Sequence, residues 1–256
     1  MSLRLLIAGK FQSSVIRIAE LFCCRGIFRL PISSRERIVV LTIDDAPSSR
    51  TNEILDLLAG HEVRATFFIH TDQINNDDRD AAMLRMQDEQ HDIAHHMPAD
   101  VSGAKLSQAQ FRSEFERSHN YLDRYSKSLK HWFRPPQGVY KHRRMAPTLR
   151  EFGYDKPLPK LTGHRNHFMA SFAPWDAVGP TNTPDTAEND RNAKRYADQL
   201  ASCIYPGSIV VFHDGEENNQ QHRLAATLQS LDRFLTLAKE NGFDVLSLSQ
   251  AIERCG

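Results

Sequence analysis

The sequence predicts an α/β fold of alternating strands and helices, and three observations support this prediction. Seven short apolar segments have the length and the β-branched content of buried strands. The segments between them carry apolar residues at helical spacing, which is typical of βα units. The 256 residues, 40% hydrophobic and 25% charged, have the ordinary composition of a globular protein. The expected strands are 38–43, 65–69, 92–95, 131–133, 168–173, 208–212 and 243–246.

Two of the intervening helices have clear boundaries. Ser107 followed three residues later by Gln110 forms a capping box, which predicts a helix start. A second helix is expected from about His222 to Glu240, because Gly242 supplies the left-handed conformation that ends helices. The apolar stripe of the first helix consists of Phe111, Phe115, Leu122, Tyr125 and Leu129.

The domain organisation follows from the length and from the N-terminal pattern. We expect one catalytic domain over 36–256, because seven strands and their helices leave little room for another. Residues 1–35 form a separate amphipathic segment, whose charges interrupt every stretch long enough for a signal peptide or a membrane span. We expect its helix, over residues 1–30, to dock on the domain; contact with a membrane surface is the alternative.

Charge and cysteine content limit the partners. Lysine plus arginine equal aspartate plus glutamate, 32 each, so nothing in the overall charge attracts nucleic acid. The four cysteines lack zinc-ligand spacing, and a link between Cys203 and Cys255 is left open. The lack of N-glycosylation sequons and of a clean leader favours an intracellular location. The sequence gives no indication of oligomeric state.

The strand 38–43 ends in two adjacent carboxylates, Asp44 and Asp45, and the chain then turns at Pro47. Two like charges this close are costly unless a cation or a proton separates them. The carboxyl ends of strands are also where α/β folds place their chemistry. The pair therefore indicates a metal site at this strand end, although a simple turn is the other interpretation.

Residues 91–100 contain a second cluster of metal-ligand types. His96 and Asp100 are four residues apart, so one helical turn would present both on one side. A histidine and a carboxylate at that spacing can occupy two positions on zinc. Together with Asp45 they would make three protein ligands and leave a position for water. Taken alone, the cluster is also typical of a polar loop.

Two further clusters follow apolar strands. Arg134 is always charged and can hold a carboxylate in a bidentate grip, and the residues after it, 135–138, fix a backbone path that can present an N–H to a ligand. His213 leaves the strand 208–212 at the same expected rim. A surface loop and a capping pair are the respective alternatives.

Together these four clusters resemble the motifs of the polysaccharide deacetylases, the NodB-homology family or carbohydrate esterase family 4. Residues 42–47 resemble the family's T-F-D-D-G-P, and residues 96–100 resemble H-[S/T]-x-x-H. Residues 134–138 resemble R-P-P-Y-G, and residues 211–213 resemble L-x-H. The resemblance spans about residues 36–253, and the motifs occur in the family's order.

The resemblance implies a deformed (β/α)7-type barrel that binds one divalent metal, usually zinc, with cobalt as an alternative. It implies that Asp45, His96 and Asp100 hold the metal, with Asp44 as general base and His213 as general acid. Arg134 would orient Asp44, and Asp176 would support the catalytic histidine. The implied substrate-binding residues are Pro136, Gln137, whose N–H would hold an oxyanion, Trp175 and Val211.

The resemblance further implies a hydrolase that removes N-acetyl groups from a chitin-like amino-sugar polymer or oligomer. Several positions depart from the motifs, and the largest departure is Asp100 in place of a metal-binding histidine. Met97, Gln137 and Val211 also differ, and Ala46 in place of glycine requires a turn without positive φ at that position. A catalytically silent protein that binds sugars or another partner, and a hydrolase of non-sugar amides, are the two alternatives.

Overall fold

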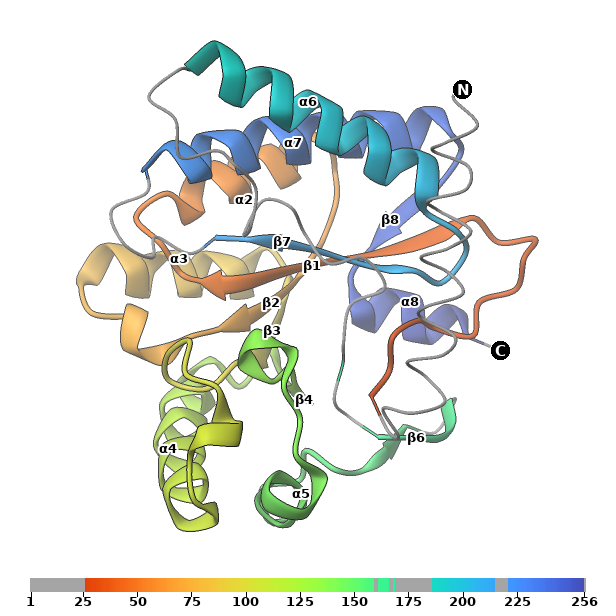
Figure 1. The fold of residues 1–256 in the computed structure, drawn as a ribbon. Coiled ribbons are helices and arrows are strands. Elements are labelled where there is room, and N and C mark those ends of the chain that lie inside the picture. Colours follow the sequence, from red (N-terminus) through yellow and green to blue (C-terminus); the bar gives the residue numbers. More distant parts are fainter. Residues whose placement is uncertain (1–25, 159–160, 166–167, 169–185, 215–220, 256) are drawn as a thin grey trace.

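Parallel strands form the centre of the computed structural model, which describes residues 26–158, 161–165, 168, 186–214 and 221–255 (Figure 1). The strand order is β4-β3-β2-β1-β7, with β8 also paired to β1, and every pairing is parallel. This confirms the α/β class. The strands are β1 (Ile38–Ala46), β2 (Thr66–Ile69), β3 (Asp92–His95), β4 (Leu129–Phe133), β7 (Ile209–His213) and β8 (Asp244–Leu246).

Helices cover the sheet, with α2, α6 and α7 gathered on one side of it (Figure 1). The capping box of Ser107 and Gln110 is present at the start of α4, and α7 ends before Gly242, which has a φ of 74°. Both sequence predictions are thereby confirmed. The helices are α2 (Thr51–Gly60), α3 (Asp77–Asp88), α4 (Gln108–Leu122), α5 (His142–Glu151), α6 (Thr186–Cys203), α7 (Gln221–Glu240) and α8 (Leu248–Arg254).

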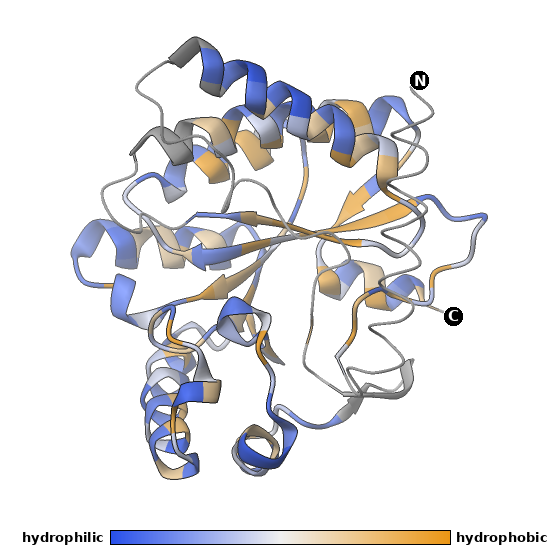
Figure 2. Ribbon diagram, viewed as in Figure 1, coloured by the Kyte–Doolittle hydropathy of each residue, from blue (hydrophilic) through white to orange (hydrophobic). Residues whose placement is uncertain are grey.

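The central strands are coloured as hydrophobic over much of their length (Figure 2). Their side chains are buried on both faces of the sheet, which explains the unbroken hydrophobic runs. One row of β1, with Val39 and Leu41, packs in the large core together with residues of α2, α6 and α7. The other row, with Ile38 and Val40, belongs to a separate cluster. Its other strand residues include Phe68, Ala94, Trp132 and Ile209. This second cluster fills the inside of the curved sheet, and the rows that build it lead to the candidate site.

Isolated backbone pairs connect the end of β4 to the start of β7 among the described residues. The N–H of Phe168 donates to the carbonyl oxygen of Phe133 at the end of β4, at 2.9 Å. Phe168 pairs with Ile27, and Arg29 pairs with Ser208 directly before β7. Residues 27–30 thus lie between Phe168 and Ser208, but regular strand pairing does not close the sheet into a barrel among the described residues.

Two sequence predictions of local structure need correction or lie largely outside the described residues. Residues 27–30 are extended rather than helical, because their backbone pairs with Phe168 and Ser208; the rest of the expected N-terminal helix lies outside the described residues. Of the strand 168–173, only Phe168 is described. An antiparallel pair, β5 (Pro157–Leu158) with β6 (Leu161–Arg165), was not predicted. Cys203 and Cys255 are both free thiols.

Replacing Gly207 with alanine is expected to lower the free energy of unfolding by about 2–4 kcal/mol, because overpacking and a left-handed backbone both cost energy. Gly207 has a φ of 83°, and a Cβ there would lie 2.1 Å from the carbonyl oxygen of Leu30. Urea unfolding measures the change. Gly60→Ala is the matched control, since its Cβ would meet nothing within 4 Å. Equal stability of the two variants would show that residues 27–30 are not held against β7.

Candidate metal centre and active site

The rows of strand side chains that belong to the second cluster, which we call the inner rows, become polar where the strands end. On β1, the row of Ile38 and Val40 continues to Thr42 and Asp44. The same period of two places one polar side chain at or just beyond the end of each neighbouring strand. These side chains are His70 after Phe68, His96 after Ala94, Arg134 after Trp132, and His213 after Ile209 and Val211. One edge of the inner face therefore collects a carboxylate, three imidazoles and a guanidinium.

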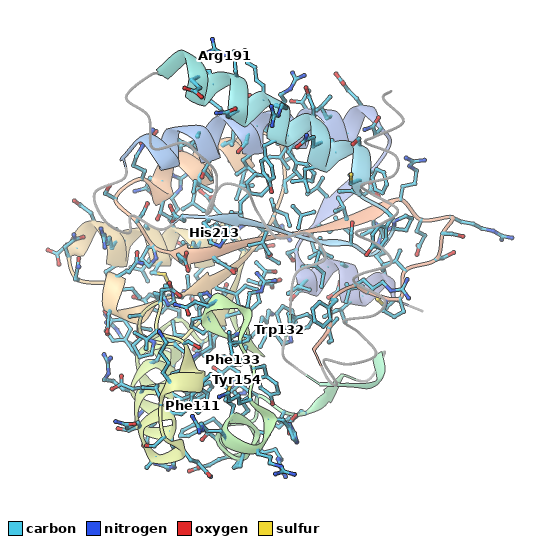
Figure 3. All side chains as sticks on the ribbon, in the orientation of Figure 1. Phe111, Trp132, Phe133, Tyr154, Arg191 and His213 are labelled. Atoms are coloured by element: carbon cyan, nitrogen blue, oxygen red, sulfur yellow. The ribbon has the colours of Figure 1, made fainter. Side chains whose placement is uncertain are left out.

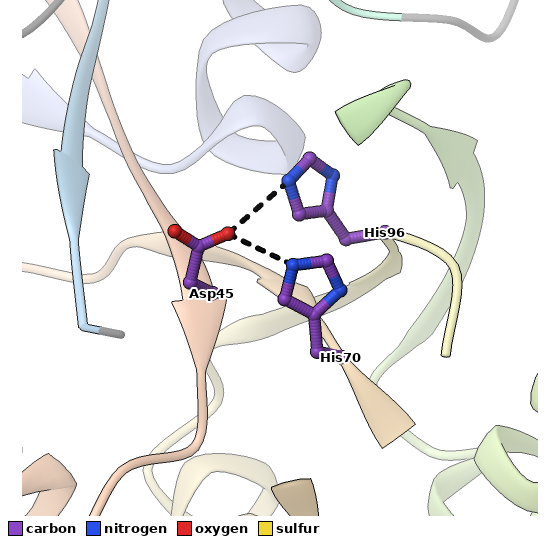
Figure 4. Close-up of side chains that lie close together, drawn as sticks. All are labelled: Asp45, His70 and His96. Carbon is purple, nitrogen blue, oxygen red and sulfur yellow. Dashed lines mark ion pairs between the residues drawn. The ribbon is translucent and has the colours of Figure 1, made fainter. Parts of the chain in front are cut away.

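Asp45, His70 and His96 form a group that fits a metal ion (Figure 4). One ligand atom from each lies within 4.8 Å of the others. Oδ1 of Asp45 is 3.0 Å from Nε2 of His70 and 3.4 Å from Nε2 of His96. The two imidazole rings are stacked, with centroids 4.6 Å apart. The three side chains come from three adjacent parallel strands, so the sheet itself sets their spacing.

Backbone carbonyls fix the orientation of both imidazoles. Nδ1 of His96 lies 2.7 Å from the carbonyl oxygen of Arg134, and Nδ1 of His70 lies 3.3 Å from that of Met97. Because a carbonyl only accepts hydrogen bonds, each Nδ1 carries hydrogen and each neutral ring keeps a lone pair on Nε2. Nε2 of His70 is buried and makes no hydrogen bond of acceptable geometry. Two such nitrogens beside a carboxylate fit a divalent cation such as zinc.

The charges of the group agree with a ligand role. Burial raises the pKa of Asp45, but contacts with His70 and His96 outweigh burial and hold this pKa well below its ordinary value. Burial lowers the pKa of His70, but Asp45 outweighs it, so the pKa of His70 is raised. Asp45 is therefore ionised, as a ligand must be. A bound cation would have to displace a proton that His70 otherwise takes up readily.

Arg134 holds Asp44, as the sequence predicted. Nη1 of Arg134 donates to Oδ1 of Asp44 at 2.5 Å and to Oγ1 of Thr42 at 2.9 Å, and Nε donates to the carbonyl oxygen of Phe168 at 3.2 Å. Burial lowers the pKa of Arg134, and Asp44 opposes that shift. The second oxygen of Asp44, Oδ2, lies 3.9 Å from Nε2 of His96. One oxygen of Asp44 is thus held, and the other faces the metal-ligand group.

His213, labelled in Figure 3, ends β7. It pairs in register with Asp44 of β1. Its neighbour Asp214 is buried and accepts hydrogen bonds from the loop that follows the two carboxylates. Oδ1 accepts from Ser48 Oγ at 2.7 Å, and Oδ2 accepts from Thr51 Oγ1 at 2.5 Å and from Ser48 N at 3.3 Å. These bonds fix the end of β7 relative to the turn after β1.

Asp100, the third ligand expected from the sequence, is not part of the metal-ligand group in the described structure. The expectation required a helical turn over 96–100, but this segment is not helical, and Met97 has a φ of 67°. The side chain of Asp100 instead lies near Gln137, whose Nε2 is 3.5 Å from Oδ2. The structure thus favours His70 over Asp100 as the third ligand.

The remaining residues expected at the site have mixed outcomes. Gln137 is exposed, with a φ of 58° in the short 3-10 turn Pro136–Gly138, and Pro136 is buried. Val211 is 2% exposed and lies two residues before His213 on the inner row. Asp176 and Trp175 lie outside the described residues. Ala46 avoids positive φ, as its Cβ requires; the positive φ of this turn, 62°, falls on Asp45.

His70 is the site residue that sequence reasoning missed. It directly follows the apolar strand segment 65–69, as Asp44 follows 38–43. The rule that polar residues after buried strands share one rim would have selected it. None of the four motifs compared above includes position 70.

Comparisons with known proteins show which family this chain resembles. The family model described as polysaccharide deacetylase matches residues 32–156, which include Asp44, Asp45, His70, His96 and Arg134. A peptidoglycan-N-acetylglucosamine deacetylase of Bacillus cereus is 32% identical over 215 residues, 82% of this chain and 66% of that protein. The chain belongs to the polysaccharide deacetylase family.

Other members of the polysaccharide deacetylase family are similar over most of the chain. A chitooligosaccharide deacetylase of Sinorhizobium fredii is 28% identical and covers 83% of this chain, which spans 90% of that protein. A pseudoenzyme of carbohydrate esterase family 4 from Bacillus anthracis was solved as a mutant with restored activity. That structure matches with a TM-score of 0.64 at 21% identity, over 90% of this chain and 71% of that one. None of the described helices has the length and apolar character needed to cross a membrane.

Proposed function

We propose that this chain is a metal-dependent hydrolase that removes N-acetyl groups from an amino-sugar polymer or oligomer. The observation that carries the proposal is the pairing of two units at one rim. Asp45, His70 and His96 form a group suited to a divalent cation, and Asp44, held by Arg134, directs its other oxygen towards that group.

Asp45, His70 and His96 would hold the metal, and zinc is the ion that their donor set suits best. When bound, such an ion supplies a water made acidic enough to attack and a positive charge beside the acetamide carbonyl. Three protein ligands leave room for both. Asp100 remains near the site without being needed for the ligand set.

Asp44 is suited to take the proton of the attacking water. Arg134 fixes its orientation through the hydrogen bond from Nη1 to Oδ1. The N–H of Gln137, presented by the turn at 136–138, would donate to the oxygen of the tetrahedral carbon. His213, on the neighbouring strand, would then donate a proton to the departing amine. The products are acetate and a free amino sugar.

The substrate class follows from what the relatives share. The Bacillus cereus relative is named for N-acetylglucosamine in peptidoglycan, and the Sinorhizobium fredii relative for chitooligosaccharides. N-acetylglucosamine is common to both polymers, so we propose it as the acetylated unit, with a chitin-like chain as the substrate expected from the sequence. Trp175 and Asp176, as pocket wall and as partner of the acid, are part of this proposal.

Acetate release from N-acetylglucosamine oligomers tests the proposal. The purified chain is assayed with added zinc or cobalt, with chelator, and as the variant Asp44→Asn. We expect metal-dependent release that falls by roughly 10²–10⁴-fold in Asp44→Asn, the usual contribution of general base catalysis. Metal-dependent acetate release that persists at the full rate in Asp44→Asn would exclude Asp44 as the base.

Replacing His213 with alanine is expected to lower kcat by roughly 10²-fold or more on N-acetylated sugars, because the departing amine loses its proton donor. Substrates with a better leaving group should lose much less. Comparing the two substrate types in one variant separates a proton donor from a residue that only maintains structure. Equal losses on both would argue against the acid role.

A catalytically silent, sugar-binding protein is the second candidate. It is favoured by the fold similarity to the Bacillus anthracis pseudoenzyme and by the change of a motif histidine to Asp100. Oligomer binding without any acetate release, in the presence of bound metal, would support it. The occurrence of His70 in the ligand group argues against it, because the group keeps three suitable ligands.

A further inference from the structure

We infer that the carboxylate of Asp100 makes glycan binding depend on the charge of the glycan. The site would favour an N-acetylated sugar unit whose adjacent unit is neutral or carries an amine over one whose adjacent unit carries a carboxylate. This inference rests on the proposed function and narrows its substrate class. It follows from four features of Asp100, which are its position, its unpaired charge, its contact with Gln137 and the apolar side chains beside it.

Asp100 lies beside the metal-ligand group without belonging to it. Its loop contacts the group directly, because the carbonyl oxygen of Met97, three residues earlier, lies 3.3 Å from Nδ1 of His70. Asp100 therefore stands in a loop that borders the metal-ligand group. With Asp45, His70 and His96 supplying the ligands, Asp100 is free to face a substrate.

The charge of Asp100 is not neutralised within the described part of the chain. Its side chain is half-buried, and no lysine, arginine or histidine there forms an ion pair with it. The other rim carboxylates that the structure describes are engaged. Asp44 is bound by Arg134, Asp45 by the two histidines, and Asp214 by Ser48 and Thr51. Among the rim carboxylates that the structure describes, Asp100 is therefore the one available to interact with a charged ligand.

Gln137 contacts Asp100, and an exposed valine follows each of these two residues closely in the sequence. Nε2 of Gln137 lies 3.4 Å from the backbone oxygen of Asp100 and 3.5 Å from Oδ2, so the loops after β3 and β4 meet here. Val101 and Val139, which closely follow Asp100 and Gln137, are 48% and 39% exposed. Only one other large apolar side chain of the described core and surface, Leu84, is as exposed.

This combination matches an amino sugar. The CH face of a pyranose ring or an acetamide methyl can contact the valines, and the amide of Gln137 can bond a hydroxyl. A protonated amine would pair with Asp100. A carboxylate, such as the lactyl group of N-acetylmuramic acid, would be repelled by it. Exposed ion pairs change binding by about two- to five-fold at low salt, and salt screens them.

Three tetrasaccharides of equal length test the inference. One is fully N-acetylated and neutral, one carries a free amine beside an N-acetylated unit, and one alternates N-acetylglucosamine with N-acetylmuramic acid. Dissociation constants are measured by calorimetry on zinc-loaded protein in an Asp44→Asn background, so that turnover does not consume the ligand. The kcat/KM values for the same three tetrasaccharides are measured in the protein with Asp44 intact. Asp100→Asn is compared with Asp78→Asn, which removes the same charge from an exposed position on α3.

We expect Asp100→Asn to keep its zinc. The ratio of its affinity for the amine-bearing tetrasaccharide to its affinity for the carboxylate-bearing one should fall by about five-fold or more, because both the attraction and the repulsion by Asp100 are removed. Asp78→Asn should leave the ratio unchanged. Loss of zinc in Asp100→Asn, an unchanged ratio, or failure of all three oligomers to bind would overturn the inference. A shifted ratio in a protein that releases no acetate would instead overturn the proposed function and leave the inference standing.

Discussion

Replacing His70 with alanine is expected to remove the bound metal and, with it, at least about 10²-fold of the activity. Changes in the outer partners of a metal site already cost 10- to 100-fold in affinity, and loss of a direct ligand should cost more. His70 supplies one of the three ligand atoms grouped in the described part of the chain, and its Nε2 has no competing hydrogen bond. Elemental analysis of protein purified without chelator, and zinc titration with a competing chelator, measure the effect.

Two further variants make this result specific to His70. His61→Ala removes a histidine whose described ion pair is with Asp232, and its metal content should equal that of the wild type. Asp100→Asn should also retain metal. If Asp100→Asn loses the metal while His70→Ala keeps it, the ligand set expected from the sequence motif is right and the group seen in the structure is not.

Arg134→Lys is expected to lower kcat by roughly 10²-fold, the usual cost of losing a group that positions a catalytic residue. The guanidinium contacts Asp44, Thr42 and Phe168 at once, and lies 4.1 Å above the ring of Phe68. A lysine keeps one charge but loses the planar fork that makes these contacts together. Steady-state kinetics on N-acetylated oligomers measures the loss.

The matched control is Arg112→Lys, because Arg112 makes a comparable forked contact with Glu151 at an exposed surface. Its kcat should stay within about two-fold of the wild type, since exposed ion pairs contribute little. Metal content and the urea unfolding midpoint of both variants show whether the site and fold remain. Normal turnover in a folded, metal-loaded Arg134→Lys would limit Arg134 to a structural role.

The sequence was sufficient wherever local pattern determines structure. The runs 38–43 and 208–212 were recognisable as strands because buried parallel strands are apolar on both faces. Once they were placed, the positions of Asp44, Asp45 and His213 at one rim followed from the parallel topology. The contact of Arg134 with Asp44 was expected from the family resemblance and not from the topology.

The third metal ligand could not be predicted from the sequence spacing of the candidate ligands alone. The spacing of His96 and Asp100 brings two side chains together only on a helix, and the left-handed Met97 directs the chain elsewhere. His70 reaches the group because β2 lies next to β1, a neighbour relation that only the sheet order reveals. Likewise, residues 27–30 pair with segments more than 100 positions away, which no local pattern encodes.

Anomalous diffraction from crystals of the zinc- or cobalt-loaded protein tests the metal centre most directly. The account expects a single strong peak at this rim, about 2.0–2.2 Å from Oδ1 of Asp45 and from Nε2 of His70 and His96. Asp100 should lie beyond bonding distance of that peak. A peak bonded to Asp100 with His70 turned away, or no peak at this rim in an active, metal-loaded enzyme, would contradict it.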